Sequence, residues 1–369
     1  MVINNPGQKS RILIASVLKP VDEPRAFEKI GQTLAGNGYE VFIAGVTASS
    51  KQTIDSISFL SHQIPGRISF SRIAVRFNIL RAALKLKPDL FIASTHELLG
   101  IGLIYRLLTG RKMIYDIQEN YLKNILYTNA FPKILRWPIA SLVRFKEMIA
   151  SVFVSGFILA EKCYEAELSF IEKKYCIAQN KTKVPVGFQR RPDSNLIKLI
   201  FTGTLAESTG VFEAITLAKK LHELDSKVSL AIVGFAPVTS VLNKILSEIK
   251  DNSFISLTGG DHFVSHYKIF ESISSANFGI ISYPACEHTR DKMPTKLYEY
   301  LACGLPFLVS KNDLWQESEL AIPINFSDYD CRQILHRLKQ PIFPSLDLAT
   351  TWESEEARLL KFIQQQNNR

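Results

Sequence analysis

The stretch RDKMPTKLYEYLACGLPFLVS, from Arg290 to Ser310, contains the two elements that decide the fold. Pro294 suits the first turn of a helix, because its missing N–H would lack a partner there in any case. Cys303 and Gly304 form a helix stop, and the apolar run LPFLVS follows directly. A helix that leads straight into a short apolar strand is typical of an α/β domain with a parallel sheet.

The same alternation extends over the rest of the chain. Apolar runs of strand length recur between helix-length segments, and one helical pattern, near 24–37, ends at Gly38. Short apolar strands between helices predict parallel sheets that are covered on both faces. We therefore expect an α/β protein with two tandem doubly wound, Rossmann-like domains. The runs are RILIASV, YEVFIAGV, PDLFIAST, RKMIYDIQE and GFILAE in the first half, and KLIFTGTL, VSLAIVGF, FISLTGG and ANFGIISY in the second.

A polar stretch, KTKVPVGFQRRPDSNL (181–196), interrupts this rhythm with prolines, charges and Gly187, as a linker does. A chain of 369 residues also exceeds the usual size of one domain. Sheets of this kind bind ligands beyond the carboxyl ends of their strands, so we expect the site in the cleft between the domains. The expected parts are residues 1–182, a linker over 183–196, a second domain over 197–345 and a closing segment over 346–369.

Composition disfavours several classes of protein. The chain is 46% hydrophobic, which argues against disorder, yet it has no run of about 18 uncharged apolar residues that would span a membrane. No apolar leader precedes the first strand. The five cysteines contain no C-x-x-C pair and indicate neither a disulfide framework nor a zinc site, so a cytoplasmic protein is expected. The first strand is not followed by G-x-G-x-x-G, which disfavours a dehydrogenase.

The charge is unevenly distributed along the chain. Residues 1–180 hold 23 of the 44 Lys and Arg and 14 of the 35 Asp and Glu, so they carry the whole net charge of +9. This asymmetry favours an anionic surface or substrate for the first half, although a basic surface that serves only solubility is an equal alternative. No nucleic-acid-binding motif is present, and we expect no nucleic acid as a partner.

The polar residues of the opening stretch suit a charged ligand. Lys296 and Glu299 lie three residues apart, on one face of the expected helix. The N-terminus of that helix offers N–H groups to a phosphate, and Lys296 adds a positive charge. Glu299 can accept two hydrogen bonds from a ribose diol, and Asp291 can reach hydroxyl groups at the other end of the ligand. The alternative is an ordinary surface helix with solvated charges.

This stretch resembles the motif of retaining glycosyltransferases of family 4, which have the two-domain GT-B fold. In that family two acidic residues flank seven others; here they are Asp291 and Glu299, with Asp in place of the more usual Glu. The resemblance covers most of the chain and implies that the final helix crosses back to the first domain. The other similar segments are DEPRAFEKIGQTLAGNGYEV, YDIQENY, IFTGTLAESTGVFEAI, LAIVGF and TWESEEARLLKFI.

The resemblance implies a set of residues that bind the donor. Glu299 would hold the ribose and Asp291 the donor sugar, both as catalytic residues. The backbone at Thr295 and Lys296 would hold the diphosphate, and Gly203 would let the backbone approach the phosphates closely. Amides and lysine would then stabilise the leaving group, so neither a metal nor another cofactor is expected.

The sequence departs from the family in the glycine loop that follows Gly203. Thr204, counted here among the donor-binding residues, and Thr209 stand where many members carry Arg and Lys. The positive charge for the phosphates must then come from elsewhere, and Arg290 and Lys296 are the candidates.

The acceptor is expected on the first domain. Gln118 stands where the family often has a histidine, so His96, at a strand end, is the alternative catalytic imidazole; it can also be a simple strand cap. The remaining histidines, such as His262 and His266, are expected to be structural or exposed. The acceptor-side candidates are Asp22, Arg25 and Glu119.

The expected function is therefore transfer of a sugar, with retention, from a nucleoside-diphosphate sugar to a glycan or lipid-linked acceptor hydroxyl. Uridine and guanosine donors both occur in the family, and cell-envelope or exopolysaccharide assembly is a common task of its members. Two alternatives stay open. One is a nucleotide-sugar 2-epimerase of the same fold, and the other is a catalytically inert partner subunit, which the threonines of the glycine loop favour.

The segment 131–157 predicts a peripheral association with the inner face of an anionic membrane. It mixes apolar and aromatic residues, Trp137 among them, with cations, as a helix in the headgroup plane does. The alternative is a helix that packs its apolar stripe on the sheet while its charges are solvated. The cations are Lys133, Arg136, Arg144 and Lys146.

Overall fold

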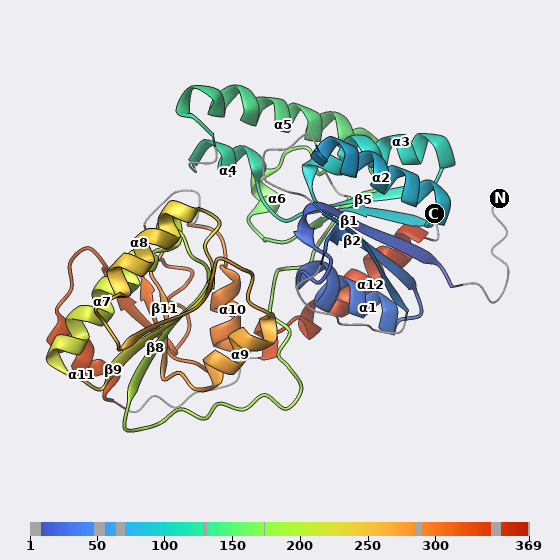
Figure 1. Ribbon diagram of the computed structural model, residues 1–369. Helices are drawn as coiled ribbons and strands as arrows, with labels where there is room; N and C mark the ends of the chain where they lie inside the picture. The colour runs from blue at the N-terminus through green and yellow to red at the C-terminus, as the bar shows by residue number, and fades with distance from the viewer. Residues whose placement is uncertain are drawn as a thin grey trace. The chain divides into compact units, whose positions relative to one another are not determined.

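A computed structural model describes residues 9–47, 56–63, 71–127, 131–172, 174–284, 290–340 and 348–367. The chain divides into two compact units, one of residues 1–180 with 355–369 and one of residues 181–354. We name them unit 1 and unit 2 and describe each by itself (Figure 1). No helix in the described part of the chain is both long and apolar enough to cross a bilayer.

Unit 1 is built on a parallel sheet whose described strands are β1 Arg11–Pro20, β2 Glu40–Val46, β3 Ile57–His62, β4 Leu90–Ala93, β5 Lys112–Ile117, β6 Gly156–Leu159 and β7 Tyr175–Ile177. Their order across the sheet is β3-β2-β1-β4-β5-β6-β7. The central strands are buried on both faces, as continuous apolar runs predict. In β1, Leu13 and Ala15 belong to one hydrophobic cluster, and Ile12 and Ile14, which alternate with them, are equally buried.

The described helices of unit 1 are α1 Gln32–Gly36, α2 Ser71–Leu86, α3 Leu99–Thr109, α4 Tyr121–Tyr127, α5 Lys133–Phe153, α6 Tyr164–Glu167 and α12 Glu353–Asn367. Helices α2, α3 and α5 lie over one face of the sheet, and α1 and α12 lie over the other (Figure 1). A π-helical segment, Arg25–Gly31, leads into α1. The helix expected near 24–37 is thus present, and it ends before Gly38, whose φ is +88°.

Unit 2 repeats this architecture with strands β8 Ile197–Thr204, β9 Val228–Phe235, β10 Ile255–Gly260, β11 Phe278–Ile281, β12 Phe307–Ser310 and β13 Ala321–Ile324. All pairings are parallel, in the order β10-β9-β8-β11-β12-β13. Separate hydrophobic clusters pack on the two faces of the sheet, one with Leu199 and Phe201 and the other with Ile200. Its described α-helices are α7 Val211–Leu224, α8 Thr239–Ile249, α9 His266–Ser274, α10 Thr295–Ala302 and α11 Cys331–Leu338.

The predicted fold class is confirmed, because both units are doubly wound parallel α/β domains. Every apolar run that was predicted to be a strand contains one. Three strands were missed, namely β3, β7 and β13, and all three lie at a sheet edge. Edge strands are short and less buried, so their sequences lack a continuous apolar run: β3 is interrupted by serines, β7 has three residues, and β13 contains a proline.

The compact units and the expected parts of the chain have different bounds. Unit 2 begins at Lys181, and it includes 183–196, which was expected as a separate linker. Arg190 holds this segment to unit 2, because its guanidinium donates a 2.7 Å hydrogen bond to the carbonyl of Gly304. The closing helix belongs to unit 1 from Glu355 onward.

Candidate functional site

The strand order of unit 2 has a switch point between β8 and β11. From β8 the chain proceeds to β9 and β10 on one side, and from β11 to β12 and β13 on the other. Doubly wound sheets bind ligands at such a point, outside the carboxyl ends of the strands. Helix α10, which packs against β11, carries Lys296 and Glu299. The two residues singled out in the sequence are therefore on the helix next to this switch point.

Gly203 and Lys296 lie together here. Gly203 has a φ of +96°, a conformation that favours glycine. A Cβ added at Gly203 would be 3.9 Å from Lys296 Cε, so the lysine side chain lies above the end of β8. Pro294 stands at the N-cap of α10, one residue before the first helical residue, Thr295. The arrangement combines the N-terminus of a helix, a lysine, and a glycine at a strand end, where a ligand can come close to the backbone.

The Lys296 side chain is buried without a hydrogen-bond partner. The residue is 5% exposed, and Nζ has no hydrogen-bond partner among the described residues. Nζ lies 3.6 Å from the ring centroid of Phe201 and 5.1 Å from that of Tyr283. Burial lowers the pKa of Lys296 to about 7, although the charge of Glu299 opposes this shift. A buried ammonium without an acceptor is costly, so an anion that reached Nζ would bind favourably.

Glu299 is held one turn further along α10. It is 5% exposed, and its Oε2 accepts a hydrogen bond from Thr202 Oγ1 at 3.4 Å. Its Oε1 lies 3.5 Å from Nε2 of His266, whose side chain is 7% exposed. No motif in the sequence connects Thr202 or His266 with Glu299. Both come from other elements, β8 and α9, and no spacing pattern could reveal the contact.

The glycine loop between β8 and α7 packs against Ser282 and is held internally by a hydrogen bond from Thr209. Gly210 has a φ of +81°, and a Cβ there would lie 1.8 Å from the carbonyl oxygen of Ser282. Ser282 Oγ donates a 2.6 Å hydrogen bond to Gly210 O. Thr209 Oγ1 donates to the carbonyl of Thr204 at 2.8 Å. Thr209, which stands where the resembled family has a cation, thus has a structural role in this loop.

The remaining donor-side candidates lie in the turn before α10. Arg290 and Asp291 are exposed, and the carbonyl of Arg290 accepts a 2.9 Å hydrogen bond from Asn312. Thr204 is exposed at the end of β8. The structure therefore brings Gly203, Lys296 and Glu299 together. The donor roles of these three residues stay predictions, as do those of Thr204, Arg290, Asp291 and Thr295. Cys286 and the other residues of 285–289 lie outside the described residues.

Unit 1 has its own switch point, between β1 and β4. Ser94, Thr95 and His96 follow β4 directly. Three side-chain atoms here, Ser94 Oγ, Thr95 Oγ1 and His96 Nδ1, are buried without a hydrogen-bond partner among the described residues. Burial, together with nearby positive charges such as Lys146, lowers the pKa of His96 to about 4. His96 is therefore a neutral imidazole at pH 7, and it directly follows two residues whose hydroxyl groups have no partner in the described part of the chain.

Arg25 lies in the interior of unit 1. It is 1% exposed, and its Nη2 lies 2.7 Å from Asp116 Oδ1. Its Nη1 donates a 3.0 Å hydrogen bond to the carbonyl of Ala178, and Gln118 Nε2 donates to Asp116 Oδ2 at 2.7 Å. Arg25 thus connects the ends of β5 and β7, and its donors are engaged within the unit.

The other acceptor-side candidates are more accessible. Asp22 is half-buried after β1, and Glu119 is exposed after β5, where it accepts a hydrogen bond from the Asn124 side chain. His96, Asp22 and Glu119 follow β4, β1 and β5, which are neighbours in the sheet. Their roles toward an acceptor stay predictions, as does that of Arg25.

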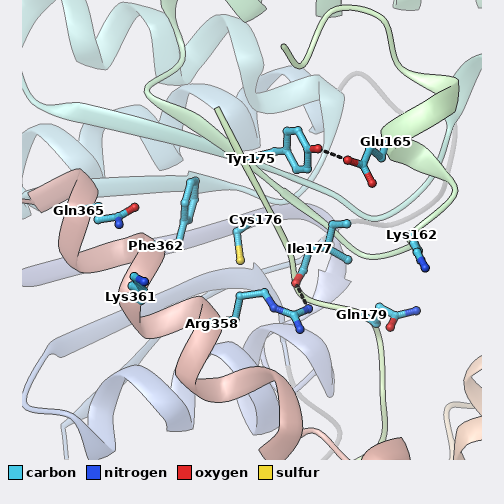
Figure 2. Close-up of a pocket in the computed structure, with 10 residues that line it drawn as sticks. All are labelled: Lys162, Glu165, Tyr175, Cys176, Ile177, Gln179, Arg358, Lys361, Phe362 and Gln365. Atoms are coloured by element: carbon cyan, nitrogen blue, oxygen red, sulfur yellow. Dashed lines mark hydrogen bonds between the residues drawn. The ribbon is translucent and has the colours of Figure 1, made fainter. Parts of the chain in front are cut away.

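A pocket of about 610 Å³ lies between β7 and α12 of unit 1 (Figure 2). Lys162, Arg358 and Lys361 give it a positive lining. Burial raises the pKa of Cys176, another lining residue, to about 11, so this thiol is neutral and unreactive. None of the site residues that were predicted from the sequence lines this pocket.

No family model and no curated protein sequence matches the chain. Solved structures do match over nearly the whole length. Sucrose-phosphate synthase from Thermosynechococcus elongatus is 12% identical with a TM-score of 0.69, and the match covers 97% of this chain and 99% of that one. Anabaena HepE in complex with UDP and glucose is 13% identical with a TM-score of 0.62, over 96% and 98% of the two chains.

A third similar structure is WaaG, a glycosyltransferase involved in lipopolysaccharide biosynthesis. It is 13% identical with a TM-score of 0.63, and the match covers 97% of this chain and 94% of that one. The chain has the GT-B fold. At these identities the similarity shows the fold alone, so the GT-B architecture is established here and the activity must be argued from the site.

Proposed function

We propose that this protein is a retaining glycosyltransferase, which transfers a sugar from a nucleoside-diphosphate sugar to an acceptor hydroxyl in cell-envelope or exopolysaccharide assembly. The observation that carries the proposal is the buried Lys296 Nζ, which has no hydrogen-bond partner among the described residues and lies at the N-terminus of α10 beside Gly203. Glu299, one turn away, completes a site for a diphosphate and a ribose. The GT-B structures that bind UDP and glucose support the same assignment.

The site residues have distinct roles in this mechanism. Lys296 and the N–H groups at the start of α10 hold the diphosphate, and Glu299 accepts the ribose hydroxyls. When the bond between the sugar C1 and the phosphate oxygen breaks, the electron pair stays on the phosphate oxygen. Lys296 stabilises this developing charge, which is worth more in a buried site than in water. Asp291 holds the donor sugar.

The acceptor is bound by unit 1. Its hydroxyl oxygen forms the new bond to C1 on the face that the leaving group vacates, and its proton passes to the departing phosphate oxygen, so configuration is retained. The neutral His96 and the unpartnered hydroxyls of Ser94 and Thr95 suit an acceptor with many hydroxyl groups.

A thermal-shift panel of uridine, guanosine, adenosine and thymidine diphosphates tests the proposal. A diphosphate at 100 times its Kd stabilises the protein by about 2.7 kcal/mol. Lys296→Ala should weaken its binding by about 10- to 100-fold, because a hydrogen bond to a charged group is worth about 1.5–3 kcal/mol. Lys250→Ala, which removes an exposed lysine at the end of α8, is the matched control and should bind normally.

The outcomes separate the alternatives. Unchanged affinity in Lys296→Ala would remove this lysine from the site. An isomerised donor sugar in the absence of any acceptor would instead indicate a nucleotide-sugar 2-epimerase of the same fold. Failure of all four diphosphates to bind would favour an inert partner subunit.

The acceptor is carried on an anionic membrane surface in this proposal. Helix α5 exposes a row of large apolar side chains to solvent, among them Ile134 at 85%, Trp137 at 71% and Leu142 at 67%. The neighbouring helix α3 adds Leu107 and Leu108, which are 76% and 66% exposed. Isolated exposed apolar residues are ordinary, whereas many of them on two neighbouring helices favour an interaction surface. We call these five residues the α5–α3 surface.

Two of the four cations of 131–157 do not face outward. Arg144 is directed toward Glu147 and Asn120, and its side chain is only 17% exposed. Lys146 Nζ donates to the carbonyl of His96. Lys133 is exposed at the start of α5, and Arg136 is half-buried there, where its Nε donates a 2.9 Å hydrogen bond to the carbonyl of Phe131. The attraction to the membrane therefore depends mainly on the apolar side chains.

A further inference from the structure

The Glu299 carboxylate has a contact on each oxygen and still has acceptor positions for a ligand. The separations to His266 Nε2 and Thr202 Oγ1, 3.5 and 3.4 Å, are long for hydrogen bonds. A carboxylate has about four acceptor positions. Glu299 can therefore accept hydroxyl groups of a ligand while both neighbours stay in place.

The His266 ring is fixed by the surrounding structure. His266 is the first residue of α9, and the Ser265 side chain caps that helix by accepting a hydrogen bond from Lys268 N. The imidazole packs edge-on against Phe270, with 4.8 Å between ring centroids. Phe270 is 1% exposed and contacts Phe188 in turn. The imidazole is therefore held by the core of unit 2 and cannot follow a ligand that enters or leaves.

The Glu299 carboxylate needs a fixed neighbour on each oxygen in order to have a defined direction. The terminal torsion of a glutamate is broad, so one contact leaves the carboxylate free to rotate. Thr202 contacts only Oε2, and Lys296 Nζ makes no hydrogen bond to either oxygen. His266 is the neighbour of Oε1.

We propose that His266 is a positioning residue, whose imidazole orients the Glu299 carboxylate so that it accepts the ribose hydroxyls of the nucleotide. This inference rests on the proposed function, in which Glu299 binds the ribose. It assigns a role to a histidine that the sequence places outside the acidic motif and on another helix. The role is specific: His266 sets the preference for ribose over deoxyribose, and it does not contact the phosphates.

The preference can be measured by calorimetry with uridine diphosphate and 2′-deoxyuridine diphosphate, or with the guanosine pair if the panel selects guanosine. His266→Ala should weaken binding of the ribonucleotide by about 3- to 10-fold and should change binding of the deoxyribonucleotide much less. His266→Gln should restore most of the preference, because its amide can place a donor near the position of Nε2. His262→Ala, which removes a histidine with a 70% exposed side chain just before α9, should match the wild type.

A double-variant cycle with Glu299→Gln distinguishes positioning from general damage. If His266 acts through Glu299, the double variant should bind no more weakly than Glu299→Gln alone. Additive losses, or an unchanged ribose preference in His266→Ala, would overturn the inference. The melting temperature of each variant is recorded as well. If His266→Ala does not fold, His266→Phe, which fills the space of the imidazole without a hydrogen-bond donor, and its combination with Glu299→Gln decide by the same criterion.

The same data separate the inference from the proposed function. If the wild type binds none of the diphosphates, the proposed function fails. If the wild type prefers ribose and Glu299→Gln loses that preference while His266→Ala keeps it, the proposed function stands and only the role of His266 is wrong.

Discussion

At the scale of single residues, the site depends on a lysine that is buried before its ligand arrives. Lys296 Nζ lies over two aromatic rings that favour its charge but accept no hydrogen bond in the ordinary sense. Burial holds its pKa at about 7. A diphosphate would supply the missing acceptors and restore the charge. The free energy of that change contributes to donor binding.

Donor binding should therefore weaken as the pH rises above 7. Near pH 7 about half of the Lys296 side chains are charged in the free protein, and a bound diphosphate favours the charged form, so binding takes up a proton. Affinity should fall by up to about tenfold per pH unit between pH 7 and 9, where the terminal phosphate, with a pKa near 6, is already ionised. Calorimetry in two buffers of different ionisation enthalpy measures the proton uptake directly.

Lys296→Ala is the control for this pH dependence, and its affinity should be flat over the same range. The stability of the protein provides a second check, because its dependence on pH should have the opposite sign to that of the affinity. The pKa of Lys296 is lower in the folded chain than its ordinary value of 10.5, so the unfolded chain binds more protons between pH 7 and 10.5. The contribution of Lys296 to stability thus rises with pH in this window. Weaker binding at pH 9 together with unchanged or greater stability would exclude unfolding as the cause, whereas a flat wild-type profile would contradict the prediction.

At the scale of elements, the glycine loop links the end of β8 to α7 and packs against Ser282, directly after β11. Replacement of glycine by alanine is expected to affect stability differently at two glycines of unit 2. Gly210 and Gly187 have nearly the same φ, +81° and +78°. A Cβ at Gly210 would lie 1.8 Å from Ser282 O, whereas one at Gly187 would meet nothing within 4 Å.

Gly210→Ala should therefore destabilise the protein far more than Gly187→Ala. The left-handed backbone alone costs about 1–2 kcal/mol for a residue with a Cβ. At Gly210 the backbone of the loop or of β11 must also move, which should bring the loss above about 4 kcal/mol. Urea unfolding of both variants measures the difference, and diphosphate binding should decrease only in Gly210→Ala. Equal losses in the two variants would show that the loop tolerates the displacement.

The elements also show what could be predicted from the sequence. Central strands such as RILIASV were predictable because burial on both faces requires a continuous apolar run. Strand β3, whose apolar residues are interrupted by serines, was not predictable, since an edge strand is only partly buried. Likewise, Lys296 and Glu299 were predictable because both are on one helix, three residues apart. The His266 contact is formed between helices α9 and α10, so it depends on packing that no local pattern encodes.

At the scale of the whole molecule, the excess of positive charge and the α5–α3 surface both belong to unit 1. Residues 1–180 carry the entire excess of +9, and the α5–α3 surface is in the same unit. Typical free energies indicate whether the cations or the apolar side chains contribute more to membrane binding. Lys133 and Arg136 would contribute about 1 kcal/mol each at an anionic leaflet, while each large apolar side chain that becomes fully buried contributes about 1.5–3 kcal/mol.

Binding to anionic liposomes should thus depend more on the apolar side chains of α5 than on its cations. A variant with Ile134→Ser, Trp137→Ser and Leu142→Ser should lose most co-sedimentation. Lys133→Ser with Arg136→Ser should reduce binding moderately and remove part of its salt dependence. Arg144→Ser with Lys146→Ser is the matched control for charge, because these cations make contacts inside unit 1. It should bind as the wild type does, provided that its melting temperature shows an intact fold.

Trp137 reports the insertion directly. The chain has three tryptophans, and the other two, Trp315 and Trp352, are 3% and 0% exposed. A blue shift of the emission on addition of vesicles must therefore come mainly from Trp137 as it leaves water, and brominated lipids should quench it. The shift should require anionic lipid at moderate salt, because the positive charge of unit 1 brings the surface to the membrane. Equal emission with and without anionic vesicles, together with no co-sedimentation, would show that the α5–α3 surface has another partner.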